Sequence, residues 1–147
     1  IIDDFRDRER VKKSINVPVF SFSNLSIQNQ MKIGIIKIDV EGAEMEVIEG
    51  LRQEIESHRP FILIEILPVY NKNNKPRLNR QNRIQKILFE CGYSIFRIKK
   101  DDKQFFELLG IDDFGIHSDL NMCEYILSPN EQNTYLNKTL ANNSYAQ

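Results

Sequence analysis

Residues 33–44 read Ile-Gly-Ile-Ile-Lys-Ile-Asp-Val-Glu-Gly-Ala-Glu, and this stretch decides the fold class. Residues 33–40 are rich in β-branched side chains and almost continuously hydrophobic, which is typical of a strand that helices cover on both faces. After Gly42, apolar residues recur at helical spacing, and several glutamates favour the positive amino end of a helix. The pattern predicts a strand at 33–40 and a helix at 43–57.

The flanking sequence extends this unit into an α/β domain. Residues 60–67 form a second apolar run, and a strand, a helix and a strand in this order predict a right-handed crossover between two parallel strands. Residues 99–120 indicate a loop that includes a short helix at most. The remaining predicted elements are a strand at 17–22, a helix at 79–91, and strands at 93–98 and 122–127.

The chain has 147 residues, which is enough for one compact domain and too few for two. We expect residues 1–13 to be a charged linker or the frayed end of a helix, residues 14–129 to form the domain, and residues 130–147 to be a polar tail. The chain opens on Ile1 instead of a methionine, so we expect that it was cut from a longer protein.

Charge and hydropathy argue against several classes of partner. The chain carries 20 basic and 21 acidic side chains, so no overall positive field attracts nucleic acid. Its apolar runs are far shorter than a bilayer span, and its first ten residues do not resemble a signal peptide. We therefore expect a cytoplasmic protein without nucleic-acid or membrane partners. Cys91 and Cys123 lack the paired spacing of a zinc site or a disulfide framework, so we expect reduced thiols and no metal.

Charged side chains gather at the end of the predicted strand at 33–40. Strand alternation would place Lys37, Asp39 and Glu41 on one face, which is unfavourable unless the side chains are paired or line a cleft. Open parallel sheets bind ligands beyond the carboxyl ends of their strands, and Glu65, late in the next strand, would reach the same edge. Carboxylates there suit hydrogen bonding to hydroxyl groups or removal of a proton from one.

A purely structural role for the same charged residues, without any chemistry, is an equally supported interpretation. Asp39 and Glu41 would cap the following helix, and Lys37 would neutralise a neighbouring carboxylate such as that of Glu65. Gly42 fits both interpretations, because glycine permits a tight turn as well as the close approach of a ligand.

Residues 37–44, Lys-Ile-Asp-Val-Glu-Gly-Ala-Glu, closely resemble the signature of FkbM-type methyltransferases. That signature is an aliphatic strand, Lys-x-Asp-x-Glu-Gly-x-Glu, and a helix that ends near a glycine such as Gly50. Arg59-Pro60, followed by an aliphatic strand and Glu65, resembles the Pro-aliphatic-Glu segment of the family. Upstream, Ser23 stands where the segment Thr-Leu-Asp-x-Leu of the family has its aspartate. The resemblance covers residues 17–70 well.

The resemblance implies the C-terminal portion of a Rossmann-like class I methyltransferase fold, with a mostly parallel sheet that ends in an antiparallel strand pair. It also implies S-adenosylmethionine as the methyl donor and a hydroxyl group of a glycan or small molecule as the acceptor. Asp39, Glu41 and Glu65 are then the expected catalytic residues, which orient the acceptor or take its proton. Lys37 and Tyr70 are the expected substrate-binding residues, Tyr70 because it lies just beyond the second strand.

The family's glycine-rich cofactor loop, which resembles Asp-x-Gly-Ala-Asn-x-Gly, should precede this region. The glycines of this chain include no close Gly-x-Gly, so we expect a fragment that lacks the loop and is inactive alone. Two alternatives remain: a non-catalytic α/β fragment or interaction module, and a haloacid dehalogenase-like phosphatase. The phosphatase motif, Asp-x-Asp-Gly-Thr, departs from this sequence at Glu41 and Ala43.

Overall fold

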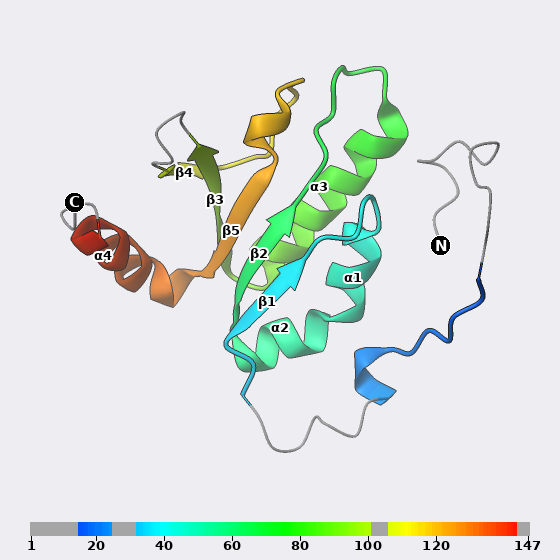
Figure 1. Cartoon of the computed structure of the whole chain (residues 1–147), viewed down its shortest axis with the longest axis horizontal. Helices are drawn as coiled ribbons and strands as arrows, with labels where there is room; N and C mark the ends of the chain where they lie inside the picture. Colours follow the sequence, from blue (N-terminus) through cyan, green and yellow to red (C-terminus); the bar gives the residue numbers. More distant parts are fainter. Residues whose placement is uncertain (1–14, 25–31, 101–105, 144–147) are drawn as a thin grey trace.

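The computed structural model describes residues 15–24, 32–100 and 106–143, which form a mixed α/β structure (Figure 1). Its centre is a five-stranded sheet with the strand order β1-β2-β5-β3-β4. The strands are β1 (Ile35–Ile38), β2 (Phe61–Glu65), β3 (Tyr93–Lys100), β4 (Phe106–Ile111) and β5 (Glu124–Pro129). The helices are α1 (Glu44–Gly50), α2 (Arg52–His58), α3 (Lys75–Glu90) and α4 (Asn133–Asn143), with the 3₁₀ helices η2 (Phe22–Asn24), η4 (Leu120–Met122) and η5 (Asn130–Gln132).

The sheet is mixed in strand direction. β1 and β2 pair in parallel, as predicted, whereas β5 lies antiparallel between β2 and β3, and β4 pairs antiparallel with β3. The predicted antiparallel pair near the end of the chain is therefore confirmed. A mostly parallel sheet is wrong for the described residues, where one strand pair is parallel and three are antiparallel. The reason is that β5 inserts between β2 and β3, which run in the same direction and would otherwise pair in parallel.

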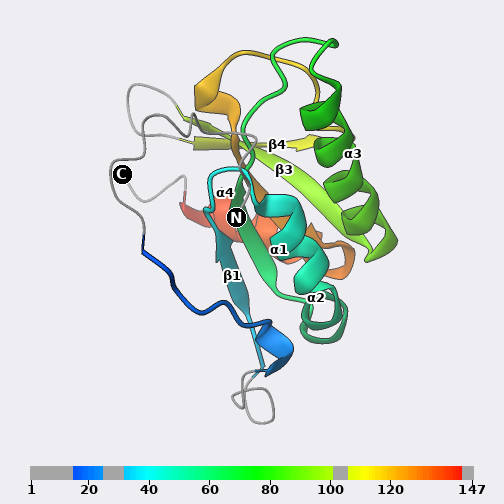
Figure 2. The same ribbon diagram turned by 90° about the vertical axis from the view of Figure 1, so that its right-hand side faces the viewer.

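Helices α1, α2 and α3 all lie on one face of the sheet, as the two views show (Figure 1 and Figure 2). Ile38 and Ile64 of the sheet join Ile48 and Leu88 of these helices in the core, each at most 2% exposed. On the opposite face, Ile35 is 73% exposed. Helices therefore do not cover β1 on both faces in the described part of the chain, contrary to the prediction, because the helices that follow β1 and β2 return on the same side of the sheet.

The helix predicted at 43–57 is present as two helices, α1 and α2. They are separated at Leu51, whose φ of −103° and ψ of 9° depart from helical values. Gly50, just before the break, is a poor helix former. The helix pattern in the sequence is thus correct in extent, but the glycine interrupts it.

Helix α3 begins at Lys75, earlier than the predicted start at 79. The side chain of Asn74 accepts a hydrogen bond from the backbone N–H of Arg77, and Pro76 occupies the first turn. Both features favour the start of a helix, so the polar loop expected here is shorter than predicted.

The sequence prediction fails at three further places. The strand predicted at 17–22 is absent: residues 15–21 lack regular structure, and Val19 is 82% exposed, so its β-prone side chains have no partner strand among the described residues. Strand β4, within the region expected to be a loop, depends on its pairing with β3. The expected polar tail contains η5 and α4. The expectation for residues 1–13 lies outside the described residues.

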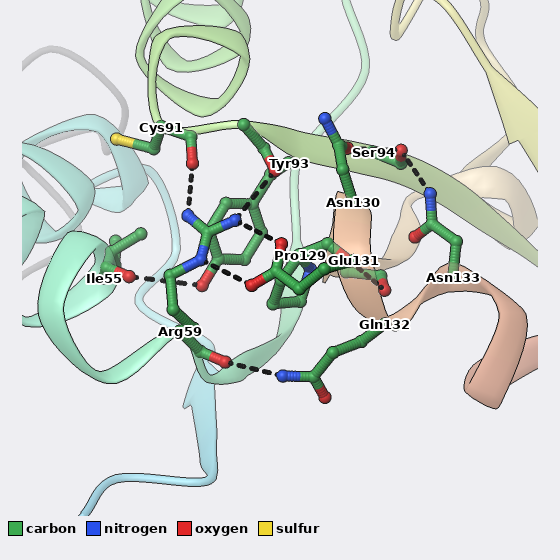
Figure 3. Close-up of polar contacts among 12 residues, drawn as sticks. Ile55, Arg59, Cys91, Tyr93, Ser94, Pro129, Asn130, Glu131, Gln132 and Asn133 are labelled. Carbon is green, nitrogen blue, oxygen red and sulfur yellow. Dashed lines mark hydrogen bonds and ion pairs between the residues drawn. The ribbon is translucent and has the colours of Figure 1, made fainter.

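Arg59 ties the carboxy-terminal segment to the amino end of β2 (Figure 3). Its guanidinium donates to the carbonyl oxygens of Cys91 and Gly92 and makes two bonds of 2.8 Å to the carboxylate of Glu131. It also lies 4.9 Å from the centre of the Tyr93 ring. The half-buried guanidinium of Arg59 therefore joins the end of α2, the turn before β3, and η5.

In the part of the chain that the structure describes, every helix is either too short or too polar to span a membrane.

Candidate active site

The candidate site lies where β1 and β2 end. Ile38 and Ile64 are register partners in the parallel pair, so Asp39, the residue after β1, and Glu65, the last residue of β2, lie side by side. A cavity of about 210 Å³ lies at this edge and is lined by Lys37, Ile38, Asp39, Leu63, Ile64, Glu65 and Glu124. The structure therefore brings together three of the residues predicted for the site, namely Lys37, Asp39 and Glu65.

Glu124 is a member of the cavity that the sequence reasoning missed. It is the first residue of β5 and the register partner of Glu65, and its carboxylate pairs with Lys100. The rule on carboxyl ends of parallel strands does not point to it, because Glu124 begins an antiparallel strand. The first residue of an antiparallel strand lies at the same sheet edge as the last residue of its neighbour. Glu124 could therefore be predicted for the site only if the pairing of β5 with β2 were known.

Glu65 carries the perturbed carboxyl group of the site. Burial raises its pKa, and the negative charges of Asp39 and Glu124 raise it further. Lys37 Nζ lies 3.1 Å from Asp39 Oδ2. Within the described residues, the side chain of Glu65 makes no hydrogen bond or ion pair. A carboxyl group with a raised pKa and no ionic partner suits the acceptance of a proton from a hydroxyl group.

A turn follows Asp39 and leads into α1. Glu41 has a φ of 56° and Gly42 a φ of 111°, and the second value is one that glycine adopts without strain. Glu41 thus lies in the turn and outside the strand, so the prediction that alternation places it on a face with Lys37 and Asp39 is wrong. Glu41 does not line the cavity, although its charge contributes to raising the pKa of Glu65.

The structural interpretation of these residues is confirmed in one part and wrong in the other. Lys37 pairs with a neighbouring carboxylate, that of Asp39, whereas α1 has no side-chain cap at its amino end. Glu44 holds the turn instead, because its Oε1 accepts a hydrogen bond of 2.7 Å from the N–H of Gly42. The carboxylates of Asp39 and Glu65 consequently remain at the cavity.

The family model for the methyltransferase FkbM domain matches residues 3–95, which is more than half of the chain. This chain belongs to the FkbM methyltransferase family. The FkbM match includes β1, the turn, β2 and α3, and therefore every residue predicted for the site, whereas Glu124 lies beyond it. Comparisons with the curated proteins and with the solved structures give no match.

FkbM membership indicates a methyltransferase in general and gives no support to the phosphatase alternative. It says nothing of Tyr70, the other predicted substrate-binding residue. Tyr70 does not line the cavity; it is 48% exposed, and the guanidinium of Arg77 lies 5.8 Å from the centre of its ring. In the described ranges, no group of three or more histidine, cysteine, aspartate and glutamate side chains is placed to hold a metal ion.

Proposed function

We propose that this chain supplies the acceptor side of an S-adenosylmethionine-dependent O-methyltransferase. The observation that carries the proposal is that Asp39 and Glu65 meet at one cavity of about 210 Å³, in a chain of the FkbM family. A neutral hydroxyl compound, either a small molecule or one sugar of a glycan, is the proposed acceptor. Its hydroxyl groups donate hydrogen bonds, and the carboxylates that line the cavity accept them.

The arrangement of the elements supports a Rossmann-like class I fold for the intact enzyme. β1, β2 and β3 run in the same direction, helices connect them on one face, and an antiparallel strand inserts between β2 and β3. Ligands of such sheets bind at the carboxyl ends of the parallel strands, which is the edge where the cavity lies.

The methyl donor requires residues that this chain does not provide. Its glycines include no close Gly-x-Gly, so we assign none of its residues to the cofactor and place the glycine-rich loop elsewhere in the intact enzyme. S-adenosylmethionine, when bound, would supply a methyl group on a positively charged sulfur; the carbon–sulfur bond would break as the acceptor oxygen bonds to the carbon, and the sulfur would keep the electron pair and become neutral. The residues of this chain act on the acceptor alone.

On the acceptor side, Glu65 takes the hydroxyl proton as the oxygen forms its new bond to carbon. The raised pKa of Glu65 suits this step, because a base is most effective when its pKa lies near the working pH. Asp39, held by Lys37 at 3.1 Å, accepts a hydrogen bond from the acceptor and orients it. Glu41 acts through its charge, which helps to keep the pKa of Glu65 high.

Methyl transfer measured with isotope-labelled S-adenosylmethionine tests the proposal. The enzyme is the chain extended upstream to any glycine-rich loop in its gene, and the acceptors are a panel of neutral sugars and small hydroxyl compounds. Glu65→Gln and Asp39→Asn should each lower kcat/KM by about a hundredfold or more. Glu107→Gln is the matched control, because Glu107 of β4 pairs with Lys99 of β3 and does not line the cavity. Wild-type rates in both site variants would overturn the assignment.

A further inference from the structure

The turn between β1 and α1 is held at both polar groups of Gly42. Its N–H donates to Glu44 Oε1 at 2.7 Å, and its C=O accepts from Arg80 Nη2 at 2.8 Å. Gly42 is buried, so its backbone groups require partners within the protein. One partner belongs to the helix that the turn begins, and the other reaches across from α3.

The guanidinium of Arg80 contacts the turn and α1 at the same time. Its Nη1 lies 2.7 Å from Glu46 Oε1, and its Nη2 bonds to the second carboxylate oxygen. The pKa of Glu46 is lowered, chiefly by this hydrogen bond from Arg80. Only the planar fork of an arginine can bind both carboxylate oxygens and still donate to a backbone carbonyl, because the ammonium of a lysine is a single point of charge.

The hydrogen bonds from Gly42 to Glu44 and from Arg80 to Gly42 matter for the geometry of the turn, because the backbone there is strained. A φ of 56° at Glu41 is uncommon for a residue other than glycine, and it persists only where the surrounding structure fixes it. A cavity of only about 30 Å³ is lined by residues of the turn and of α3, among them Gly42, Arg80 and Gln81. Asp39 precedes Glu41 by two residues, so a displaced turn would move the carboxylate that lines the acceptor cavity.

We propose that Arg80 is a positioning residue of the acceptor site: it holds Gly42 and so fixes the turn that follows Asp39, the residue that lines the cavity with Glu65. Its part in methyl transfer rests on the proposed function, whereas its hold on the turn does not. Arg80 lies on α3, outside the motif at residues 37–44, and only the packing of α3 on the turn points to it.

The chain offers a matched control in Arg83. Arg83 also joins α3 to α1, because its Nε lies 2.8 Å from Glu49 Oε1, one turn further along both helices than Arg80 and Glu46. In the described part of the chain, Glu49 is its only polar partner. Substitution of Arg83 therefore removes an ion pair between the same helices without touching the turn.

Hydrogen exchange of the Gly42 amide, followed by NMR, tests the hold on the turn. In Arg80→Met, this amide should exchange about tenfold faster than in the wild type, because the turn loses the hydrogen bond to the Gly42 carbonyl oxygen and keeps only that of the Gly42 N–H to Glu44. Arg80→Lys keeps the charge without the fork and should behave like Arg80→Met. Arg83→Met should exchange at the wild-type rate. Wild-type rates in both Arg80 variants, or equal acceleration in Arg83→Met, would overturn the proposal.

Binding of methyl glucoside, a neutral polyhydroxylated probe, tests the consequence for the site. Changes in the NMR chemical shifts of the Asp39 and Glu65 amides during a titration report binding. Both Arg80 variants should bind methyl glucoside at least about threefold more weakly than the wild type and Arg83→Met do. Equal binding in all variants would overturn the role of Arg80 at the site. If the wild-type chain does not respond, the acceptor role and the proposed function fail together, while the exchange rates still decide whether Arg80 holds the turn.

Discussion

Glu65 and Glu124 are register partners across the antiparallel pair β2–β5, so two carboxylates lie side by side at one edge of the sheet. Lys100 pairs with Glu124, whereas the described residues offer Glu65 no ionic partner. Burial and the neighbouring negative charges raise the pKa of Glu65. An arrangement that destabilises a charged group at a cavity is typical of a functional site, because stability alone would not favour it.

Glu65→Gln should stabilise the protein at neutral pH. The folded-state pKa of Glu65 is raised, so the folded protein binds the proton more tightly than the unfolded chain does. The ionised form therefore weakens the fold once the pH rises above the unfolded value of about 4.3. Thermal unfolding should show a higher Tm for Glu65→Gln at pH 7, and the difference should disappear near pH 4. A lower Tm at pH 7 would contradict this reading of the site.

Glu124→Gln should lower the pKa of Glu65. The negative charge of Glu124 is one of the causes that raise this pKa, and the substitution removes the charge while keeping the side chain's shape. NMR titration of the Glu65 side-chain carboxyl carbon measures the shift directly. Glu107→Gln, which removes a carboxylate that pairs with Lys99, should leave the pKa of Glu65 unchanged. Identical titration of Glu65 in the wild type and in Glu124→Gln would show that the two carboxylates do not interact.

Arg59→Met should destabilise the fold by about 2 kcal/mol, because it leaves the carbonyl oxygens of Cys91 and Gly92 without their donor. It also removes the ion pair with Glu131 and the cation over the Tyr93 ring. Urea unfolding measures the loss.

The control for this measurement is Arg52→Met. Arg52 also makes two ion pairs, with Glu56 and Glu90, but its side chain is 40% exposed and donates to no backbone carbonyl among its described contacts. Exposed ion pairs contribute little to stability, so Arg52→Met should unfold close to the wild-type midpoint. An equal loss in both variants would show that the backbone contacts of Arg59 do not matter.

The Arg59–Glu131 pair should also make stability depend on pH in the acid range. The hydrogen bond from Arg59 lowers the pKa of Glu131 to about 2, below the value of about 4.3 in an unfolded chain. The contribution is therefore complete above about pH 4.3 and is lost as the pH falls toward 2. Glu131→Gln should be less stable than the wild type at pH 7 and equal to it near pH 2. The difference at pH 7 should be small, because the Glu131 side chain is 54% exposed.

The sequence predicts the central unit of the fold because local patterns define it. The β-branched run at 33–40, the helical spacing after Gly42 and the second apolar run indicate β1, the following helices and β2. Parallel pairing then places the ends of the two strands at one edge, which is why the meeting of Asp39 with Glu65 is predictable.

What the sequence does not predict depends on contacts between distant segments. Glu124 reaches the cavity because β5 inserts beside β2, and Arg80 reaches the turn because α3 packs against α1. β4 contains Gly110, a residue type that is rare within strands, so its sequence does not indicate a strand; it forms through its pairing with β3. Glu41 departs from strand alternation because β1 ends at Ile38 and the chain turns at Glu41 and Gly42, and neither residue type nor spacing indicates a φ of 56° there.

The central claim is that this sheet edge serves methyl transfer from S-adenosylmethionine, and calorimetric binding of that molecule tests it most directly. The titration compares this chain with a version extended upstream to include any glycine-rich loop in its gene. Binding by the extended chain, and none by this chain alone, is the predicted result. Absence of binding by both chains would contradict the claim and leave the carboxylates of Asp39 and Glu65 without a methyl donor to serve.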